Sequence, residues 1–252
     1  MIVLRKTDLL GELMPAQRER APGLDAYVGT LRIDGAVHLH RSMAEATSLH
    51  ETSFFRERET FDLLRDTILP RLIANNAAQR RLRIWSAAAS TGQEAYSVAM
   101  LLREHFAELA DWDVRIIGTD LSREAIEYAR RGCYRRLEVN RGLPARMLVK
   151  HLAREGDEWQ IDPGLRSMCE FTQADLCAPV PELPRFDLVL LRNVLLQLPQ
   201  REVGGVFTRV YGQMNPNGVL ILGSAEQAED WTGLFHTQPG GRCWYYRPRT
   251  DA

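Results

Sequence analysis

The chain has 252 residues, 45% of them hydrophobic and 26% charged, which is an ordinary globular composition and excludes a disordered chain. Its 32 basic and 33 acidic side chains nearly cancel, so no overall field attracts nucleic acid or an anionic membrane. No apolar run is long enough to span a membrane, and the N-terminus lacks the apolar core of a signal peptide. We expect a cytoplasmic protein with no nucleic-acid binding and no direct membrane insertion.

Cysteine spacing gives no sign of a metal site or a disulfide framework. None of the four cysteines belongs to a Cys-x-x-Cys pair or to a histidine-rich cluster. We therefore expect no metal, and reduced thiols suit the cytoplasm. The four are Cys133, Cys169, Cys177 and Cys243.

After residue 80 the sequence alternates short apolar strands with amphipathic helices, which is typical of a parallel sheet wrapped by helices. Ser122 and Gly132 are a helix start and stop signal. In chain order we expect a strand ending at Trp85, a helix over 93–107, the strand "DVRIIGTD", a helix from Ser122 to about Arg131, the strands "MCEFTQAD" and "FDLVLLRN", a helix from about Gln200 to Met214, the turn "NPNG", the strand "GVLILGS" and a hairpin in "FHTQPGGRCWYYRP". A parallel sheet that ends in a hairpin is the layout of a large methyltransferase class.

Two segments fall outside this pattern. Residues 1–50 are expected to be mostly helical, with breaks at Pro15 and Pro22. A stretch at about 136–167, rich in Pro and Gly, interrupts the strand–helix alternation. We therefore expect a short helical N-terminal region and a methyltransferase domain over 51–252, which carries a small inserted subdomain.

The end of the first predicted strand, in "RIWSAAASTGQEAYS" at 83–97, is a candidate binding site. Ligands of open α/β sheets bind beyond the carboxyl ends of the strands. A dinucleotide would require Gly-x-Gly-x-x-Gly here, but the sequence has three alanines and only Gly92. Small residues without a phosphate cradle suit S-adenosylmethionine, and its sulfonium cation suits Glu94. The alternative for Glu94 is a favourable interaction with the helix dipole, which is common for acidic residues in first turns.

Three later strand ends also carry polar residues. Asp120 is placed to accept hydrogen bonds from ribose hydroxyls, although an Asp there can also cap the next helix. Asp175 is placed to meet an adenine amino group or is an ordinary loop residue. Arg192 and Asn193 follow a strand buried on both faces, so they emerge together at the sheet edge. A salt bridge and a role in the site are equally good explanations for this arginine.

Several motifs together resemble the CheR family, the chemotaxis methyltransferases that esterify glutamate side chains of bacterial chemoreceptors. The resemblance covers roughly residues 50–247, and the motifs occur in the order and approximate spacing of that family. They are "TSFFRE" at 52–57, "RIWSAAASTGQEAYS" at 83–97, "GTD" at 118–120, "ARRGCYR" at 129–135 and "FDLVLLRNV" at 186–194.

The resemblance implies S-adenosylmethionine as cofactor and S-adenosylhomocysteine as product. It implies that Thr52 and Arg56 lie over the cofactor, that Glu94 faces the methionyl part, that Asp120 binds the ribose, and that Leu176 packs on the adenosine. The residues expected to hold the cofactor are His50, Thr52, Arg56, Gly92, Glu94, Asp120, Asp175, Leu176, Arg192 and Asn193.

The chain departs from the family pattern at five positions. It has His50 in place of Asn, Gln93 in place of a second Glu, Ala95 in place of Pro and Asp175 in place of Asn. At the reaction centre the family tyrosine is replaced by Gln197, so an amide stands where a phenol is usual. Arg56 and Gln197 are the catalytic candidates.

The parts of the family that recognise receptors also differ. Only about 50 residues precede the "FFR" motif, fewer than in the family's helical N-terminal domain, and "REGDEWQ" lacks a Gly-x-Gly insertion found in members that bind a receptor tether peptide. We expect recognition of the cytoplasmic helices of chemoreceptors without a tether peptide.

The expected reaction is an in-line displacement in which a glutamate carboxylate attacks the sulfonium methyl. A carboxylate is already ionised near neutral pH, so no general base is required. Two other functions stay open at this point. One is a regulatory module that binds the cofactor with little turnover, and the other is a carboxyl methyltransferase acting on a different protein or a small acid.

Overall fold

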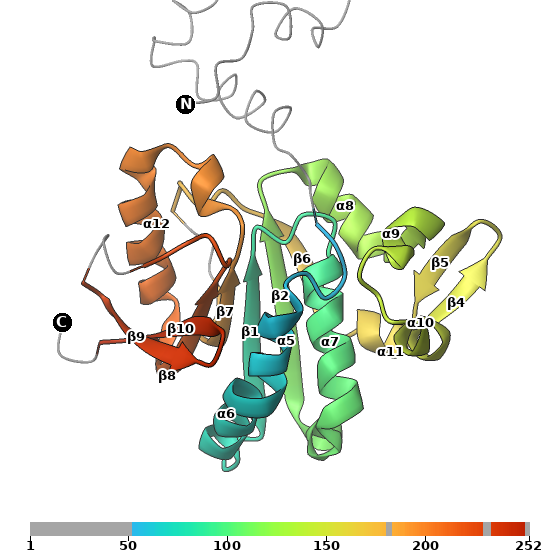
Figure 1. Ribbon diagram of the computed structural model, residues 1–252, viewed down its shortest axis with the longest axis horizontal. Helices are drawn as coiled ribbons and strands as arrows, with labels where there is room; N and C mark the ends of the chain where they lie inside the picture. The colour runs from blue at the N-terminus through green and yellow to red at the C-terminus, as the bar shows by residue number, and fades with distance from the viewer. Residues whose placement is uncertain (1–51, 180–182, 229–232, 250–252) are drawn as a thin grey trace, which may run out of the picture. The chain divides into compact units, whose positions relative to one another are not determined.

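A seven-stranded sheet forms the centre of the described part of the chain in the computed structural model, which describes residues 52–179, 183–228 and 233–249 (Figure 1). The strand order is β6-β2-β1-β7-β8-β10-β9. The first five of these strands are parallel, and β10 runs antiparallel to β8 and β9. The strands are β1 Arg81–Ala87, β2 Asp113–Asp120, β6 Cys169–Gln173, β7 Phe186–Leu191, β8 Met214–Leu222, β9 Phe235–Gly240 and β10 Cys243–Pro248. The predicted parallel α/β sheet with a terminal hairpin is confirmed.

The strand order reverses between β1 and β7. From β1 the chain builds outward to β2 and β6, then returns to the other side of β1 for β7 and β8. At such a reversal, the connections that leave neighbouring strands diverge to opposite sides and open a crevice at the carboxyl ends. This edge is therefore where a ligand site is expected.

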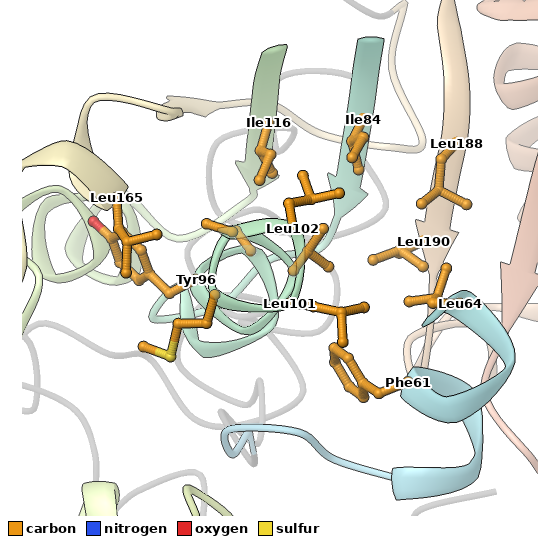
Figure 2. Packing of buried hydrophobic residues seen from close by; sticks show 14 of the residues in the cluster. Phe61, Leu64, Ile84, Tyr96, Leu101, Leu102, Ile116, Leu165, Leu188 and Leu190 are labelled. Carbon is orange, nitrogen blue, oxygen red and sulfur yellow. The ribbon is translucent and has the colours of Figure 1, made fainter. Parts of the chain in front are cut away.

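Helices cover both faces of the sheet, and strand residues alternate between two hydrophobic clusters. Ile84 and Leu188 pack with Leu101 and Leu102 of α7 in one cluster, as Figure 2 shows. Trp85, the neighbour of Ile84, packs in the other cluster, which α12 covers. Burial on both faces explains why the strands are continuous apolar runs. The helices along the sheet are α5 Arg58–Leu63, η1 Leu64–Ile68, α6 Leu69–Asn76, α7 Gln93–His105, η2 Ala107–Asp111, α8 Arg123–Arg131, η3 Leu195–Gln197 and α12 Gln200–Gly212.

The helical run before β1 was not expected from the sequence. It is continuous from α5 to α6, but η1 between them is a turn of π-helix. Pro70, at the start of α6, has no N–H to donate and its ring crowds the preceding turn. A π-turn accommodates such a residue, so the proline widens this helix without ending it.

A small antiparallel sheet follows α8, in the region of the predicted insertion. Its order is β3-β5-β4, and three short helices accompany it. These elements lie beside α8 in Figure 1. The division into a short N-terminal region and one methyltransferase domain stays a prediction, because residues 1–51 lie outside the described residues. The elements are β3 Cys133–Arg135, α9 Arg136–Asn140, α10 Ala145–His151, β4 Leu152–Glu155, β5 Glu158–Ile161 and α11 Pro163–Arg166.

Local signals account for both ends of α8. Ser122 caps α8 by accepting from Ala125 N at 3.1 Å, and Gly132 ends the helix with φ 62°. The prediction of a separate "NPNG" turn before the last parallel strand was wrong. Those residues lie within β8, where the register to β7 shifts between Phe186 and Leu188. Pro216 cannot donate to a ladder, so this stretch bulges out of the pairing.

Candidate cofactor and reaction site

The turn after β1 is built from left-handed backbone. Ala88, Ser90 and Gly92 have φ values of 63°, 50° and 93°. A side chain at Gly92 would place its Cβ 2.9 Å from Ala129 Cβ, so only glycine fits there. Left-handed conformations of non-glycine residues are strained and persist where surrounding contacts fix them. Five of the six such residues in the described part of the chain lie around this edge of the sheet, namely Phe55, Glu57, Ala88, Ser90 and Asn193.

Asp120 ties this turn to the end of β2. Its Oδ2 accepts a hydrogen bond from Ser90 N at 2.8 Å, and its Oδ1 accepts from Ser122 N at 2.9 Å. Ser122, and not Asp120, caps α8, so helix capping does not explain this carboxylate. Each carboxylate oxygen can accept more than one hydrogen bond. Asp120 is only partly buried, which leaves it able to accept hydroxyl donors as well.

Glu94 makes two side-chain contacts in addition to its favourable position in the first turn of α7. Its Oε1 accepts from the Ser86 hydroxyl at 2.7 Å, and its Oε2 pairs with Arg192 Nη1 at 2.8 Å. Gly92 at the N-cap has no side chain that could cap the helix. The carboxylate is thus held between β1 and the end of β7, at the point where the strand order reverses.

Arg192 is the centre of an ion cluster. Its side chain is 1% exposed, and its Nη2 donates to the Arg56 carbonyl at 2.7 Å and to Glu57 Oε2 at 3.1 Å. Burial lowers the pKa of this guanidinium, but the charges of Glu94 and Glu57 raise it above its usual value overall. The salt-bridge alternative is therefore confirmed for Arg192, and the bridge it makes holds a candidate site residue in place.

Glu57 was missed as a site residue in the sequence. Its Oε1 accepts from Asn193 Nδ2 at 2.9 Å, and its Oε2 accepts from Ser224 N at 3.1 Å in addition to Arg192. Burial raises the pKa of this carboxyl, but the Asn193 amide and the charge of Arg192 outweigh it and lower the pKa below its usual value. The signal was present, because Glu57 directly follows the "FFR" motif.

Glu226 was missed as well. Its carboxylate accepts from three backbone N–H groups, those of Asn193 and Leu195 at 2.7 Å and that of Gly223 at 2.9 Å. It therefore joins the ends of β7 and β8 beneath η3. No sequence pattern marks this role, because the three donors are main-chain atoms from two separate loops.

The segment 52–57 is fixed across the N-terminal end of α7. Phe54 is fully buried with its ring 5.0 Å from that of Tyr134, and Phe55 N donates to Ser97 Oγ at 3.0 Å. A Cβ at Gly142 would lie 2.1 Å from the Phe54 carbonyl oxygen, so the backbone of the insertion presses directly on this segment. Thr52 and Arg56 of the same segment are partly exposed, and His50 lies outside the described residues.

The remaining predicted residues lie at the edges of this arrangement. Gln197 is exposed in η3, and its Nε2 donates to the Asn193 carbonyl at 2.9 Å. Asp175 accepts from Cys177 N at 2.8 Å, and Leu176 packs against the cluster that α12 covers. The structure thus joins Glu94, Arg192, Asn193 and Gln197 through hydrogen bonds and connects Asp120 to the turn after β1. Within the described part, no hydrogen bond joins Asp175 or Leu176 to those residues.

The donor set fits S-adenosylmethionine. Glu57 and Glu94 set two carboxylates against the single guanidinium of Arg192, and Asp120 adds a third carboxylate at the end of β2. This excess of negative charge suits a cationic ligand and would repel a phosphate. Among the described residues, the Ser90 hydroxyl is buried without a hydrogen-bond partner, so the turn holds a polar group for a ligand to satisfy. The strained small-residue turn lets a ligand approach the backbone closely.

Fold and site together define an α/β methyltransferase of the S-adenosylmethionine-binding class. Residues 50–242 match the family described as "CheR methyltransferase, SAM binding domain". The chain belongs to the CheR methyltransferase family, uses S-adenosylmethionine, and is an enzyme of chemotaxis methylation.

Three chemotaxis methyltransferases are similar to this chain over most of its length. "Chemotaxis protein methyltransferase 1" of Pseudomonas aeruginosa is 36% identical over 193 residues, which is 75% of this chain and 70% of that protein. "Chemotaxis protein methyltransferase Cher2" of Pseudomonas putida is 33% identical over the same shares. "Chemotaxis protein methyltransferase 2" of Vibrio cholerae is 29% identical over 226 residues, 88% of this chain and 78% of that protein.

In the described residues, no helix has the length and apolarity needed to cross a membrane.

Proposed function

We propose that this enzyme transfers the methyl group of S-adenosylmethionine to glutamate side chains of bacterial chemoreceptors and forms glutamate methyl esters. The observation that carries the proposal is the ion cluster at the strand-order reversal, in which Arg192 holds Glu94 at 2.8 Å and Glu57 at 3.1 Å. This cluster stands at the edge where the cofactor of such a sheet binds. The relatives named as chemotaxis methyltransferases support the choice of substrate.

The cofactor supplies a methyl group on a cationic sulfur. In our proposal Glu94 orients the methionyl part, with its carboxylate held by Ser86 and Arg192. Asp120 accepts hydrogen bonds from the ribose hydroxyls, and Asp175 and Leu176 contact the adenine. These contacts do not touch the acceptor, so they bind cofactor and transition state about equally.

The acceptor carboxylate needs orientation more than activation. It is ionised near neutral pH, so no side chain has to remove a proton. Arg56 is proposed to orient it together with the Gln197 amide, which can donate a hydrogen bond and is held just after β7 by its contact with Asn193. Alignment of two reactants can lower a barrier by roughly 7–11 kcal/mol, which makes positioning the main contribution expected from these residues.

The proposed partner is the cytoplasmic helical part of a chemoreceptor, recognised without a tether peptide, and the proposed location is the cytoplasm. The described cysteines are all free thiols, which is compatible with a reducing compartment. We further propose that residues 51–252 act as one catalytic domain, with the small β3-β5-β4 sheet as an insertion in it.

The test is methyl transfer to purified receptor cytoplasmic fragments with radiolabelled S-adenosylmethionine. Base treatment should release the label as methanol, because a glutamate methyl ester is hydrolysed by base. Receptor fragments in which the methylated glutamates are replaced by alanine should take up no label. Cofactor binding with no transfer to any receptor, or transfer only to small acids or to other proteins, would overturn this assignment of substrate.

A further inference from the structure

Glu57 has more solvent access than any other charged member of the ion cluster. Its side chain is 20% exposed, compared with 14% for Glu94 and 1% for Arg192. Glu57 therefore keeps an opening to solvent that Arg192 lacks.

The orientation of Glu57 is fixed from several sides. Three separate groups donate to its two oxygens, namely Asn193 Nδ2 at 2.9 Å, Arg192 Nη2 at 3.1 Å and Ser224 N at 3.1 Å. Its own backbone is left-handed, with φ 58°, a conformation that a non-glycine residue keeps only where its surroundings hold it. Without these partners, a glutamate at this position would relieve the strain by adopting an ordinary helical or extended conformation.

The cluster carries an excess of negative charge. Glu57 and Glu94 share the single guanidinium of Arg192. Adding Glu226 and Arg56, which adjoin the cluster in space and in sequence, leaves one more carboxylate than guanidinium groups. Unlike Asp120, which in the proposed function holds the ribose, Glu57 and Glu94 meet at Arg192, just after β7, and in the proposed function Glu94 lies beside the methionyl part that carries the sulfur.

We propose that Glu57 is a specificity-determining residue that distinguishes the cationic cofactor from its neutral product. The inference rests on the cofactor lying along Glu94, as in the proposed function, but not on the identity of the acceptor. Cofactor and product share the adenosine and the amino-acid parts, and they differ by one methyl group and one positive charge on sulfur. A carboxylate near the sulfur therefore stabilises only the cofactor, whereas Asp120 contributes equally to both. The lowered pKa keeps Glu57 ionised at neutral pH.

The experiment measures the Kd of S-adenosylmethionine and of S-adenosylhomocysteine by calorimetry in the full chain and in Glu57→Gln. The amide keeps the shape of the side chain and removes its charge. Affinity for the cofactor should fall about fivefold to thirtyfold more than affinity for the product, which corresponds to one charge pair a few ångströms apart under a dielectric between that of a protein surface and that of water. An analogue that carries a protonated amine in place of the sulfonium should follow the cofactor.

Two variants separate the charge effect from structural damage. Glu59→Gln makes the same change on an exposed position two residues later and should leave both Kd values unchanged. Glu57→Asp keeps the charge with a shorter reach, so the ratio of the two Kd values should stay near that of the original chain even if both affinities drop. If Glu57→Gln does not fold, the ratio of the two Kd values in Glu57→Asp is the measurement that tests the inference.

Equal loss of both ligands in Glu57→Gln, or an aspartate variant whose ratio changes as much as that of the glutamine variant, would overturn the role of Glu57. If the original chain binds neither ligand, both the placement of the cofactor and the role of Glu57 are wrong. If both ligands bind and receptor methylation alone is absent, only the proposed substrate fails and the inference on Glu57 stands.

Discussion

The two halves of the site are held together in different ways. On the β1–β2 side, main-chain N–H groups of the turn at 88–92 make the contacts to the end of β2, with Ala89 N donating to the Thr119 carbonyl and Ser90 N to the Asp120 carboxylate, both at 2.8 Å. On the β7–β8 side, Arg192 and its partners are joined by side chains that come from segments more than 90 residues apart, with sequence separations of 98 to Glu94 and 135 to Glu57.

Because of this difference, the two halves should respond differently to amino-acid substitutions. A main-chain half depends on local backbone conformation, so we expect it to tolerate change in distant segments. In the proposed function it binds the parts that cofactor and product share. A side-chain half in low dielectric depends on every charge in it, because removal of one partner leaves another unpaired. Gln197, where the family resemblance implies a tyrosine, lies in the second half, where the reaction itself is expected.

The largest expected effect is that of Arg192→Ala. It leaves Glu57 and Glu94 without their cation in a mostly buried cluster, and breaking such pairs typically costs about 3–5 kcal/mol in unfolding free energy. Chemical denaturation should show a loss of unfolding free energy near the lower end of this range, because both carboxylates keep some solvent access. Methyl transfer should be abolished. As a control, Arg123→Ala breaks the exposed pair with Glu127 and should change stability by no more than about 0.5 kcal/mol.

A smaller effect is expected for Asp120→Ala, which affects the main-chain half. Loss of a hydrogen-bonded carboxylate typically costs about 1.5–3 kcal/mol, so the affinities for cofactor and product should both fall roughly tenfold to hundredfold. Calorimetry with both ligands measures this. Unchanged affinity would mean that Asp120 only holds the turn through Ser90 and does not bind ribose.

The third prediction concerns Gln197→Tyr. A phenol restores an aromatic face that attracts a cation and a hydroxyl that donates, so the methylation rate should rise by roughly tenfold if the barrier falls by about 1.4 kcal/mol. Cofactor affinity should change little. Gln200→Tyr, an exposed position at the start of α12, is the matched control. A large drop in rate would show that this pocket is adapted to glutamine and to another acceptor.

The smallest effect is a pH dependence of stability from Glu57. Its pKa is lower in the folded chain than its usual value of 4.5. The stabilisation is therefore complete above the unfolded pKa and is lost as the pH falls below about 4.5 through the folded pKa. Thermal denaturation between pH 6 and roughly pH 3 should show a shallower acid loss in Glu57→Gln than in the original chain. Parallel curves for the two proteins would contradict the lowered pKa.

Much of the fold follows from the sequence, because apolar periodicity, Ser122 and Gly132 act locally. The main-chain half of the site also follows, since Asp120 and Gly92 end or adjoin predicted strands that must meet at one edge. The side-chain half does not follow in the same way. That Glu226 bonds to Asn193 and Leu195, or that Arg192 reaches the carbonyl of Arg56, depends on how distant loops pack. The π-turn before Pro70 and the bulge at Pro216 have local causes, because proline cannot donate to a helix or a ladder, but apolar periodicity does not reveal them.

A crystal structure with S-adenosylhomocysteine bound tests the placement of the cofactor most directly. The account predicts the ribose on Asp120, the amino-acid part beside Glu94, and the sulfur on the side of Glu57, with the pairs to Arg192 intact. A product bound away from the reversal between β1 and β7, or a complex in which Glu94 and Asp120 both lie out of contact with it, would contradict the proposed site.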